Sequence, residues 1–261
     1  MVQLALRTAR SAVQNFQRIN EHLDIAREEN TVEQLLEDTA KSVETFIIKQ
    51  LCRAHPEHSF KGQFERPITG EGEGKDTTWI VNPTHGWNNL SRSIPMSALS
   101  ISIEIKGKIE HTIVINPFTG DEFYASRGRG AQRNGRRIRA SAQRSLDSGK
   151  YALPLPDLKN RARDFPLYTA LNQQIGQVAE SIHSSGCLLL DLLSTNAGFT
   201  DASIVFGASE DEMQIAALFA KESGSLIGAI NGSPNLPQSG NLLLANPKMY
   251  KVILQIAKVH L

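Results

Sequence analysis

The sequence predicts a mixed α/β protein built as a layered sandwich, because helical and strand-forming segments come in separate blocks along the chain. Up to about residue 54, apolar side chains recur at spacings of three and four without a glycine or proline. Between about residues 77 and 126, apolar and polar residues alternate and turn sequences intervene. Helical periodicity then returns from residue 164.

The first block indicates two helices that are separated near Glu29-Asn30, with Val43, Ile47 and Leu51 on the apolar face of the second. The strand block has two turn sequences, Lys106-Gly107-Lys108 and residues 117–120, which predict an antiparallel meander. The strands expected in this meander are 78–81, 98–105, 112–115 and 122–125.

The C-terminal half is expected to mix helices with short strands. A helical region over 164–198 is followed by a helix over 212–223, which Gly224 closes. Asn246-Pro247 opens a final helix over 247–259, since asparagine suits the N-cap and proline the first turn. Short strands are expected near 202–206, 226–230 and 242–244. With no repeat or linker, the sequence predicts one domain, 1–261, in two closely packed lobes of about 1–145 and 146–261.

Composition excludes several classes of protein. The chain has 261 residues, 40% of them hydrophobic, and a formal net charge of +1, so no whole-protein field favours nucleic acid or membrane. No apolar run approaches the ~20 residues that span a bilayer, and no signal-peptide core follows Met1. Cys52 and Cys187 stand in apolar contexts and are expected to be reduced thiols. We expect a soluble, cytoplasmic protein without membrane contact.

Short motifs follow one another almost from end to end. They are Trp79 to Pro83 with Gly86 and Asn89, residues 105–108, Asn116-Pro117, residues 122–131 with Asn134-Gly135, Ser185-Gly186, residues 190–192, residues 222–224, Gly240-Asn241 and residues 245–247. In this order and spacing the chain resembles the inositol monophosphatase family, and most closely its bacterial SuhB branch. The resemblance implies a layered α-β-α-β-α fold of the inositol monophosphatase and sugar phosphatase type, a homodimer, and a Mg²⁺-dependent phosphomonoesterase.

The metal ligands of that family are largely missing. Gln63 stands where the family has the first glutamate of a Glu-Glu pair, Asn82 and His85 replace two loop aspartates, and Glu212 replaces a late aspartate. Mg²⁺ prefers carboxylates, which offset its charge. Four family carboxylates would give −4, whereas Glu212 alone gives −1 here, a difference of three units. We therefore expect these four positions to be a vestigial metal site, with no catalytic residue and no bound metal.

Further departures fall on the substrate side and on the water that attacks phosphate. Residues 34–37 stand where the family has an Asp-x-Val-Thr segment, and Trp87 replaces a threonine. Leu188-Leu189 replaces a small pair and is expected to intrude where a sugar-like ring binds, while Val205 replaces a substrate-facing acid. The resemblance thus implies a fold that has lost its catalysis.

Several side chains allow two interpretations. His85 with Glu212 is either a relic polar pair or an alternative zinc or manganese pair. Trp87 either fills a vacated metal cavity or stacks on a ligand. His58 and His183 are expected to be surface or capping histidines.

Arginine is concentrated in one stretch, with seven arginines in eighteen residues. Such a density is typical of a surface that binds RNA or an acidic protein, and equally of a solvated hairpin around Asn134-Gly135. The arginines of this candidate partner-binding patch are Arg127, Arg129, Arg133, Arg136, Arg137, Arg139 and Arg144.

Two functions from different classes follow. The first, by resemblance, is a non-catalytic Nus factor of the SuhB type that acts in ribosomal RNA antitermination through NusA and RNA polymerase, with a possible RNA contact. The alternative is a Mg²⁺-dependent inositol-1-phosphate phosphatase with substituted ligands, because amide carbonyls also coordinate hard cations. A third option is a pseudoenzyme that still binds a small phosphate compound near Ser185-Gly186.

Overall fold

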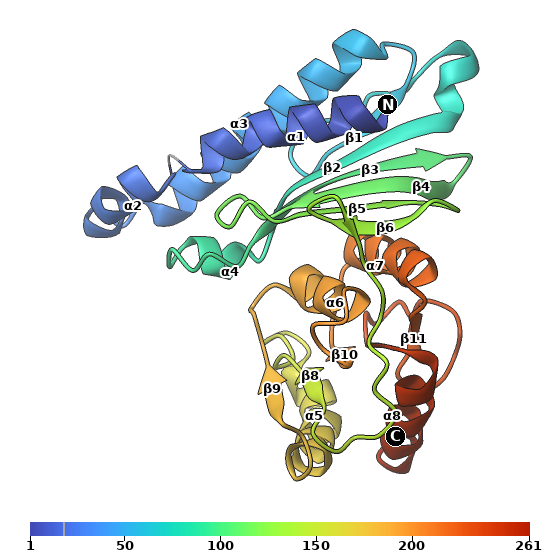
Figure 1. The fold of residues 1–261 in the computed structure, drawn as a ribbon. Helices are drawn as coiled ribbons and strands as arrows, with labels where there is room; N and C mark the ends of the chain where they lie inside the picture. Colours follow the sequence, from blue (N-terminus) through green and yellow to red (C-terminus); the bar gives the residue numbers. More distant parts are fainter. Residues whose placement is uncertain (18) are drawn as a thin grey trace. The chain divides into compact units, whose positions relative to one another are not determined.

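The computed structural model describes residues 1–17 and 19–261 (Figure 1). The chain divides into two compact units. Unit 1 comprises residues 1–127 and 132–135, and unit 2 comprises residues 128–131 and 136–261. The single domain with a lobe boundary near residue 145 stays a prediction.

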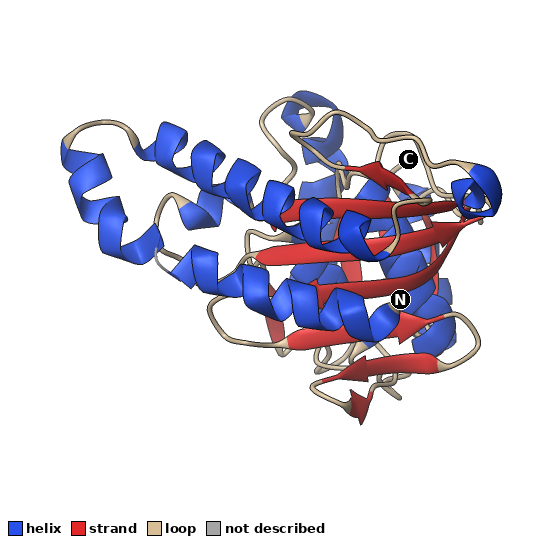
Figure 2. Ribbon diagram, turned by 90° about the horizontal axis from the view of Figure 1, so that it is seen from above, coloured by secondary structure: helices blue, strands red, loops and turns tan. Residues whose placement is uncertain are grey.

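Unit 1 begins with helices α1 (Val2–Gln17), α2 (Ile19–Glu28) and α3 (Val32–Ala54). The break expected near Glu29-Asn30 is confirmed, because α2 ends at Glu28 and Asn30 has a positive φ of 56°. The predicted first helix is described as two, α1 and α2, and position 18 between them lies outside the described residues. Helices α1 and α3 lie side by side across one face of the unit 1 sheet (Figure 2).

The predicted antiparallel meander is confirmed in unit 1. Strand β2 pairs with β3, β3 with β4, and β4 with β5, all antiparallel. The strands are β2 (Thr77–His85), β3 (Ala98–Ile105), β4 (Lys108–Ile115) and β5 (Glu122–Ser126). Lys106 and Gly107 form the first turn with φ of 51° and 73°, which suits a two-residue hairpin loop. Lys108, expected in the turn, is the first residue of β4, because partly exposed polar residues hide the start of this strand.

Shorter elements of the first half were not predicted. Strand β1 (Ser59–Lys61) pairs with β2 in parallel, after α3 and before the short helix η1 (Gly72–Asp76). Helix α4 (Trp87–Leu90) follows β2, and strands β6 (Gly130–Arg133) and β7 (Arg136–Arg137) follow β5. These elements of two to five residues lack the apolar run or alternation by which the equally short strands elsewhere in the chain were predicted.

Unit 2 contains a five-stranded mixed sheet in the order β11-β12-β10-β8-β9. Its strands are β8 (Lys150–Ala152), β9 (Ser181–His183), β10 (Ala202–Val205), β11 (Leu226–Ala229) and β12 (Leu242–Ala245). The continuous helical region expected over 164–198 is wrong. It contains α5 (Arg161–Gly176), then β9, then α6 (Leu188–Asn196), because Ser181–His183 pairs in parallel with β8, a contact between distant segments that periodicity cannot reveal.

Helices cover both faces of the unit 2 sheet. Ile204 and Leu243 face a core that includes residues of α5 and α8 (Pro247–Val259), whereas Val205 and Leu242 face one that includes residues of α6 and α7 (Glu210–Ser223). The predicted helices 212–223 and 247–259 are confirmed, with Gly224 at φ 86° closing α7 and Asn246 capping α8. The strands expected near 202–206, 226–230 and 242–244 are confirmed as β10, β11 and β12.

Two sheets and their covering helices confirm the mixed α/β class. Cys52 and Cys187 are both free, as expected. Within residues 1–17 and 19–261, no helix combines the length and the apolar character that crossing a bilayer requires.

Candidate functional site

The loop that follows β1 is held by a buried carboxylate. Glu44 of α3 is fully buried, and its two oxygens accept the backbone N–H groups of Gln63, Phe64 and Glu65 at 2.7, 2.9 and 2.6 Å. Gly62 makes this approach possible, since a Cβ there would collide with the Glu44 carboxylate. The backbone of this loop is therefore fixed by the buried Glu44 carboxylate, while the Gln63 side chain is exposed.

Two of the four vestigial positions lie side by side in unit 1. Lys61 of β1 is the parallel partner of Ile80 of β2, and Gln63 and Asn82 each stand two residues further on. Gln63 therefore follows the carboxyl end of β1, next to Asn82, which lies three residues before the end of β2. The Asn82 Oδ1 atom accepts the Thr84 N–H at 3.0 Å, so this oxygen is already engaged in the irregular part of β2 around Pro83.

His85 ends strand β2 just after an irregularity in its pairing with β3. Its side chain is only 3% exposed, and its Nε2 atom lies 2.9 Å from the Ser100 hydroxyl. Trp87, two residues later, is half-buried and packs against the hydrophobic core of unit 1. Packing thus explains Trp87 without a stacked ligand.

Glu212, the fourth position, belongs to unit 2 and to the cap of α7. The Ser209 hydroxyl accepts the Glu212 N–H at 3.3 Å, and Glu212 Oε2 accepts the Ser209 N–H at 2.9 Å. This reciprocal capping box satisfies two groups that a helix start leaves open. The side chain that aligns with a family metal ligand thus stabilises the first turn of a helix.

This donor set does not fit a cluster of Mg²⁺ ions. Of the three positions in unit 1, Gln63 and Asn82 are neutral amides and His85 is buried against a hydroxyl. Divalent ions held together need carboxylates to offset their mutual repulsion. We therefore derive no catalytic step through a metal here.

The expected substrate side is mostly core. Leu189 and Val205 are both fully buried, so only the half-buried Leu188 of the three is in a position to crowd a ligand. The expectation that both leucines intrude on a ring site is therefore wrong for Leu189.

Ser185 uses its hydroxyl within its own turn, since Oγ contacts both the N–H and the carbonyl of Cys187. Asp191, in the first turn of α6, accepts the Ser185 N–H at 3.2 Å. Burial raises the pKa of Asp191 to about 6, and hydrogen bonds from the Ser185 side chain and backbone act in the opposite direction.

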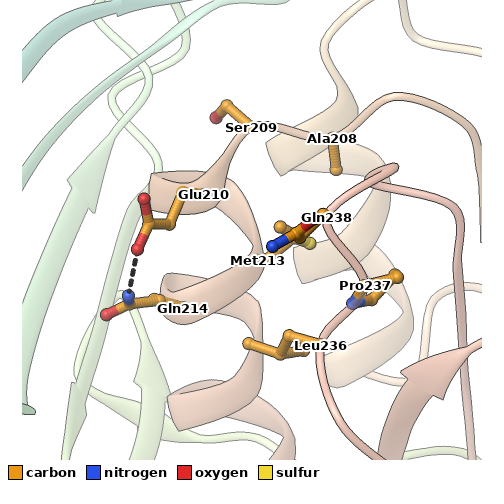
Figure 3. A pocket seen from close by; sticks show the side chains of 8 residues that line it. All are labelled: Ala208, Ser209, Glu210, Met213, Gln214, Leu236, Pro237 and Gln238. Carbon is orange, nitrogen blue, oxygen red and sulfur yellow. Dashed lines mark hydrogen bonds between the residues drawn. The ribbon is translucent and has the colours of Figure 1, made fainter. Parts of the chain in front are cut away.

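A pocket of about 480 Å³ lies in unit 2, between the first turns of α7 and the loop 236–238 (Figure 3). Met213, Leu236 and Pro237 supply apolar surface, and Glu210 Oε1 accepts a hydrogen bond from Gln214 at 3.2 Å. None of its eight lining residues is cationic, and Glu210 is its one carboxylate. A phosphate group would find no ion-pair partner among these side chains.

The seven arginines divide into two groups. In unit 1, Arg127 donates to the Ile109 carbonyl and pairs with Glu110 at 3.0 Å, and Arg133 pairs with Asp121 at 2.6 Å. Those two side chains therefore hold the sheet, as the hairpin interpretation expects. The remaining five, in unit 2, are exposed: Arg129, Arg136, Arg137, Arg139 and Arg144.

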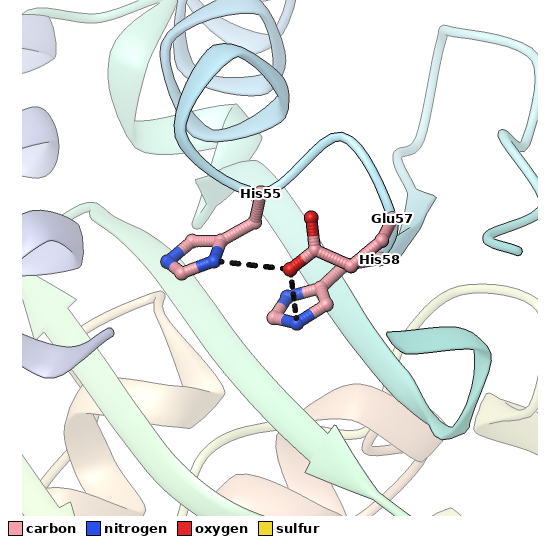
Figure 4. A group of neighbouring side chains, drawn as sticks. All are labelled: His55, Glu57 and His58. Carbon is pink, nitrogen blue, oxygen red and sulfur yellow. Dashed lines mark ion pairs between the residues drawn. The ribbon is translucent and has the colours of Figure 1, made fainter. Parts of the chain in front are cut away.

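One cluster escaped the sequence interpretation. His58, expected at the surface or in a cap, is 7% exposed, and its Nδ1 atom lies 2.9 Å from Nε1 of Trp79. Its Nε2 atom lies 3.2 Å from Glu57, and His55 lies 3.5 Å from the same carboxylate oxygen (Figure 4). The available signal was the run His55-Pro56-Glu57-His58, just before a strand. His183 is exposed, as expected.

Comparisons with known proteins agree along the whole chain. The model of the inositol monophosphatase family matches residues 1–260. The Nus factor SuhB of Pseudomonas aeruginosa is 35% identical over 263 residues, covering 100% of this chain and 97% of that protein. The Nus factor SuhB of Escherichia coli is 27% identical, covering 97% and 94%. The crystal structure of the extragenic suppressor protein SuhB of Bartonella henselae has a TM-score of 0.83 at 24% identity, covering 100% and 99%.

Proposed function

The chain belongs to the inositol monophosphatase family, and from this premise we propose that it is a SuhB-type Nus factor without phosphatase activity. It acts in transcription antitermination of ribosomal RNA, through NusA and RNA polymerase as protein partners and as a homodimer. The relatives named Nus factor SuhB support the transcription role.

The observation that carries the inactive part of the proposal is the pair of amides at the ends of β1 and β2. Gln63 and Asn82 stand side by side where the family resemblance places carboxylates, and the Asn82 oxygen is engaged by Thr84. His85 is buried and Glu212 belongs to a helix cap. Each position thus has a structural role or a neutral side chain.

The partner test uses the purified full-length chain with NusA and RNA polymerase from its own organism, in size-exclusion chromatography. We expect it to co-elute with one or both proteins. A variant in which the five exposed arginines of unit 2 become glutamine shows whether they take part, and its unfolding curve controls for folding. The absence of any complex with the unmodified chain would contradict the proposal.

The activity test measures phosphate release from inositol 1-phosphate across a Mg²⁺ titration. We expect no turnover above background. A variant with Gln63→Glu, Asn82→Asp, His85→Asp and Glu212→Asp restores the family's carboxylates, and a second that omits Glu212→Asp keeps the capping box intact. Activity in either variant alone would identify the missing ligands as the reason for inactivity.

The retained loop frame favours a second candidate. Glu44 still holds residues 63–65 in place, so the alternative is a Mg²⁺-dependent inositol-1-phosphate phosphatase with amide ligands. Clear Mg²⁺-dependent turnover by the unmodified chain would establish it and refute the inactive assignment.

A further inference from the structure

The cluster of His55, Glu57 and His58 in unit 1 has the composition of a transition-metal site but not its geometry. One ligating atom from each residue lies within 4.8 Å of the others. The two imidazole rings, however, are stacked with centroids 4.6 Å apart and an interplanar angle of 1° (Figure 4). Imidazole lone pairs lie in the ring plane, so those of two parallel rings do not converge on one ion.

Trp79 fixes the tautomer of His58. The indole N–H is only a donor, so the Nδ1 atom of His58, 2.9 Å away, must accept. A neutral His58 then carries its proton on Nε2, which lies 3.2 Å from Glu57 Oε1 and donates to it. Neither nitrogen keeps a lone pair for a metal, which is a second reason against metal binding.

We propose instead that His58 is a proton-sensitive latch between the end of α3 and strand β2. In its neutral form it accepts from Trp79 on one side and donates to Glu57 on the other. A second proton can enter only at Nδ1, where it displaces the Trp79 N–H from its acceptor. Protonation therefore breaks the bond from this turn to β2, the strand whose far end carries Asn82 and His85.

Burial makes this exchange consequential. Trp79 is 0% exposed, so its displaced N–H has no water to turn to, and a buried unsatisfied donor is destabilising. The Phe60 ring stacks with the indole ring of Trp79 at a centroid distance of 6.5 Å. The indole is thus packed among apolar and aromatic groups of the core. Loss of this one hydrogen bond therefore destabilises the core of unit 1, to which Trp79 belongs.

Burial and the neighbouring charges set the direction in which the pKa of His58 is shifted. Burial lowers the pKa of His58, the neighbouring His55 lowers it further, Glu57 opposes them, and the amino group of Met1 acts with His55. Helix η1 packs on Glu57 through Gly74. The elements that meet here also carry, among other ionisable groups, Arg53 at the end of α3, Lys61 of β1, His85 of β2, and Glu73, Lys75 and Asp76 of η1. The pKa of His58 in the folded state lies below its unfolded value of 6.5. The latch therefore holds at neutral pH and opens as the pH falls through this lower, folded-state pKa.

The test follows the indole Nε1–H resonance of Trp79 by NMR on the full chain between pH 8 and pH 5. Trp87 is the second tryptophan, and a Trp87→Phe variant assigns the two resonances. We expect a one-proton transition with a midpoint below 6.5, in which the Trp79 resonance moves upfield as its hydrogen bond is lost. His58→Gln keeps an acceptor for the indole but has no proton to gain, so the transition should disappear while the fold remains.

A matched variant, His55→Gln, removes the neighbour that lowers the His58 pKa, and the midpoint should move to higher pH. A Trp79 resonance that does not move in the unmodified chain would overturn the proposal, as would a transition that persists in His58→Gln. Zn²⁺ added at pH 8 serves as a further check. Stoichiometric shifts of the His55 and His58 ring resonances would replace the latch by a metal site.

Discussion

Two buried carboxylates, Glu44 in unit 1 and Asp191 in unit 2, hold loops at positions of the family's site, yet they are satisfied very differently. Glu44 is fully buried and accepts three backbone N–H groups. Asp191 is 4% exposed and accepts one N–H, from Ser185, at 3.2 and 3.4 Å to its two oxygens. The Ser185 side chain and backbone both lower the pKa of Asp191, yet burial dominates and raises it to about 6.

Both carboxylates are buried, so what separates them is the number of backbone N–H groups that each accepts. Each hydrogen bond to the charged form offsets part of the loss of water. Three backbone donors make Glu44 a fixed point for residues 63–65, whereas at Asp191 the hydrogen bonds from Ser185 do not outweigh burial, and the pKa rises to about 6. Substitutions at these two residues should therefore differ in size and in pH dependence.

The largest effect is expected for Glu44→Ala. It leaves three backbone N–H groups without their acceptor, and part of that loss is recovered by water at the exposed loop. With one to three kcal/mol for each donor that stays buried, we expect the free energy of unfolding to fall by roughly 3 kcal/mol. Urea denaturation measures it. Gln63→Ala, an exposed neighbour in the same loop, is the control and should change stability by less than about 0.5 kcal/mol; equal losses in the two variants would contradict the anchoring role.

Asp191→Asn should show the opposite sign at neutral pH. The folded carboxyl holds its proton up to a pKa of about 6, against 3.8 unfolded, so wild-type stability is lost as the pH rises between these values. Asparagine keeps an acceptor for Ser185 and carries no charge. At 1.36 kcal/mol per pKa unit, the shift from 3.8 to about 6 leads us to expect the variant to be about 3 kcal/mol more stable than wild type at pH 8.

The difference should shrink to about 1 kcal/mol at pH 4.5, because the folded carboxyl is then protonated and this pH lies close above the unfolded pKa of 3.8. Urea denaturation at both pH values measures this gap, which is the difference in unfolding free energy between the variant and the wild type. A gap that does not change with pH would refute a buried, partly protonated Asp191.

Gly62→Ala tests whether the Glu44 carboxylate needs the space that this glycine leaves open. The added Cβ collides with the Glu44 carboxylate and forces it away from the three N–H groups. Overpacking of this kind destabilises by about 1–3 kcal/mol. In a Glu44→Ala background the obstacle is absent, so the second substitution should add almost nothing. A double-mutant cycle measures this coupling, and simple additivity would contradict it.

The smallest effect concerns the arginines. Arg133→Ala removes a half-buried ion pair with Asp121 and should cost about 0.5–1 kcal/mol, whereas the exposed Arg129→Ala should leave stability unchanged. If the exposed arginines serve the proposed partners, complex formation should show the reverse order. Thermal unfolding and co-elution with NusA and RNA polymerase measure the two properties separately.

The sequence predicted the long elements well because their signals are local. Asn246-Pro247 marks the start of α8, Gly224 the end of α7, and Lys106-Gly107 the first hairpin turn. Strand β9 was missed because its pairing partner, β8, lies about thirty residues earlier. Strand β1 was missed because three residues carry no measurable period.

The four expected ligand positions stay a prediction, and their contacts could not be read from the sequence. Alignment of Gln63, Asn82, His85 and Glu212 with family ligands follows from motif spacing alone. The role of Glu44 depends on bringing a helix residue under a loop nineteen residues further along, and His58 depends on Trp79 of another strand. Such contacts are set by tertiary packing, which no single segment encodes.

The hydrogen bonds from main-chain amides to Glu44 also determine how freely the side chains of residues 63–65 can be substituted. Because the loop is gripped through its backbone, the side chains at residues 63–65 are substituted without remodelling the turn that presents them. Exchange of an amide for an acid at Gln63, in either direction, should therefore be nearly neutral for folding. New side-chain chemistry can be introduced in this loop one residue at a time.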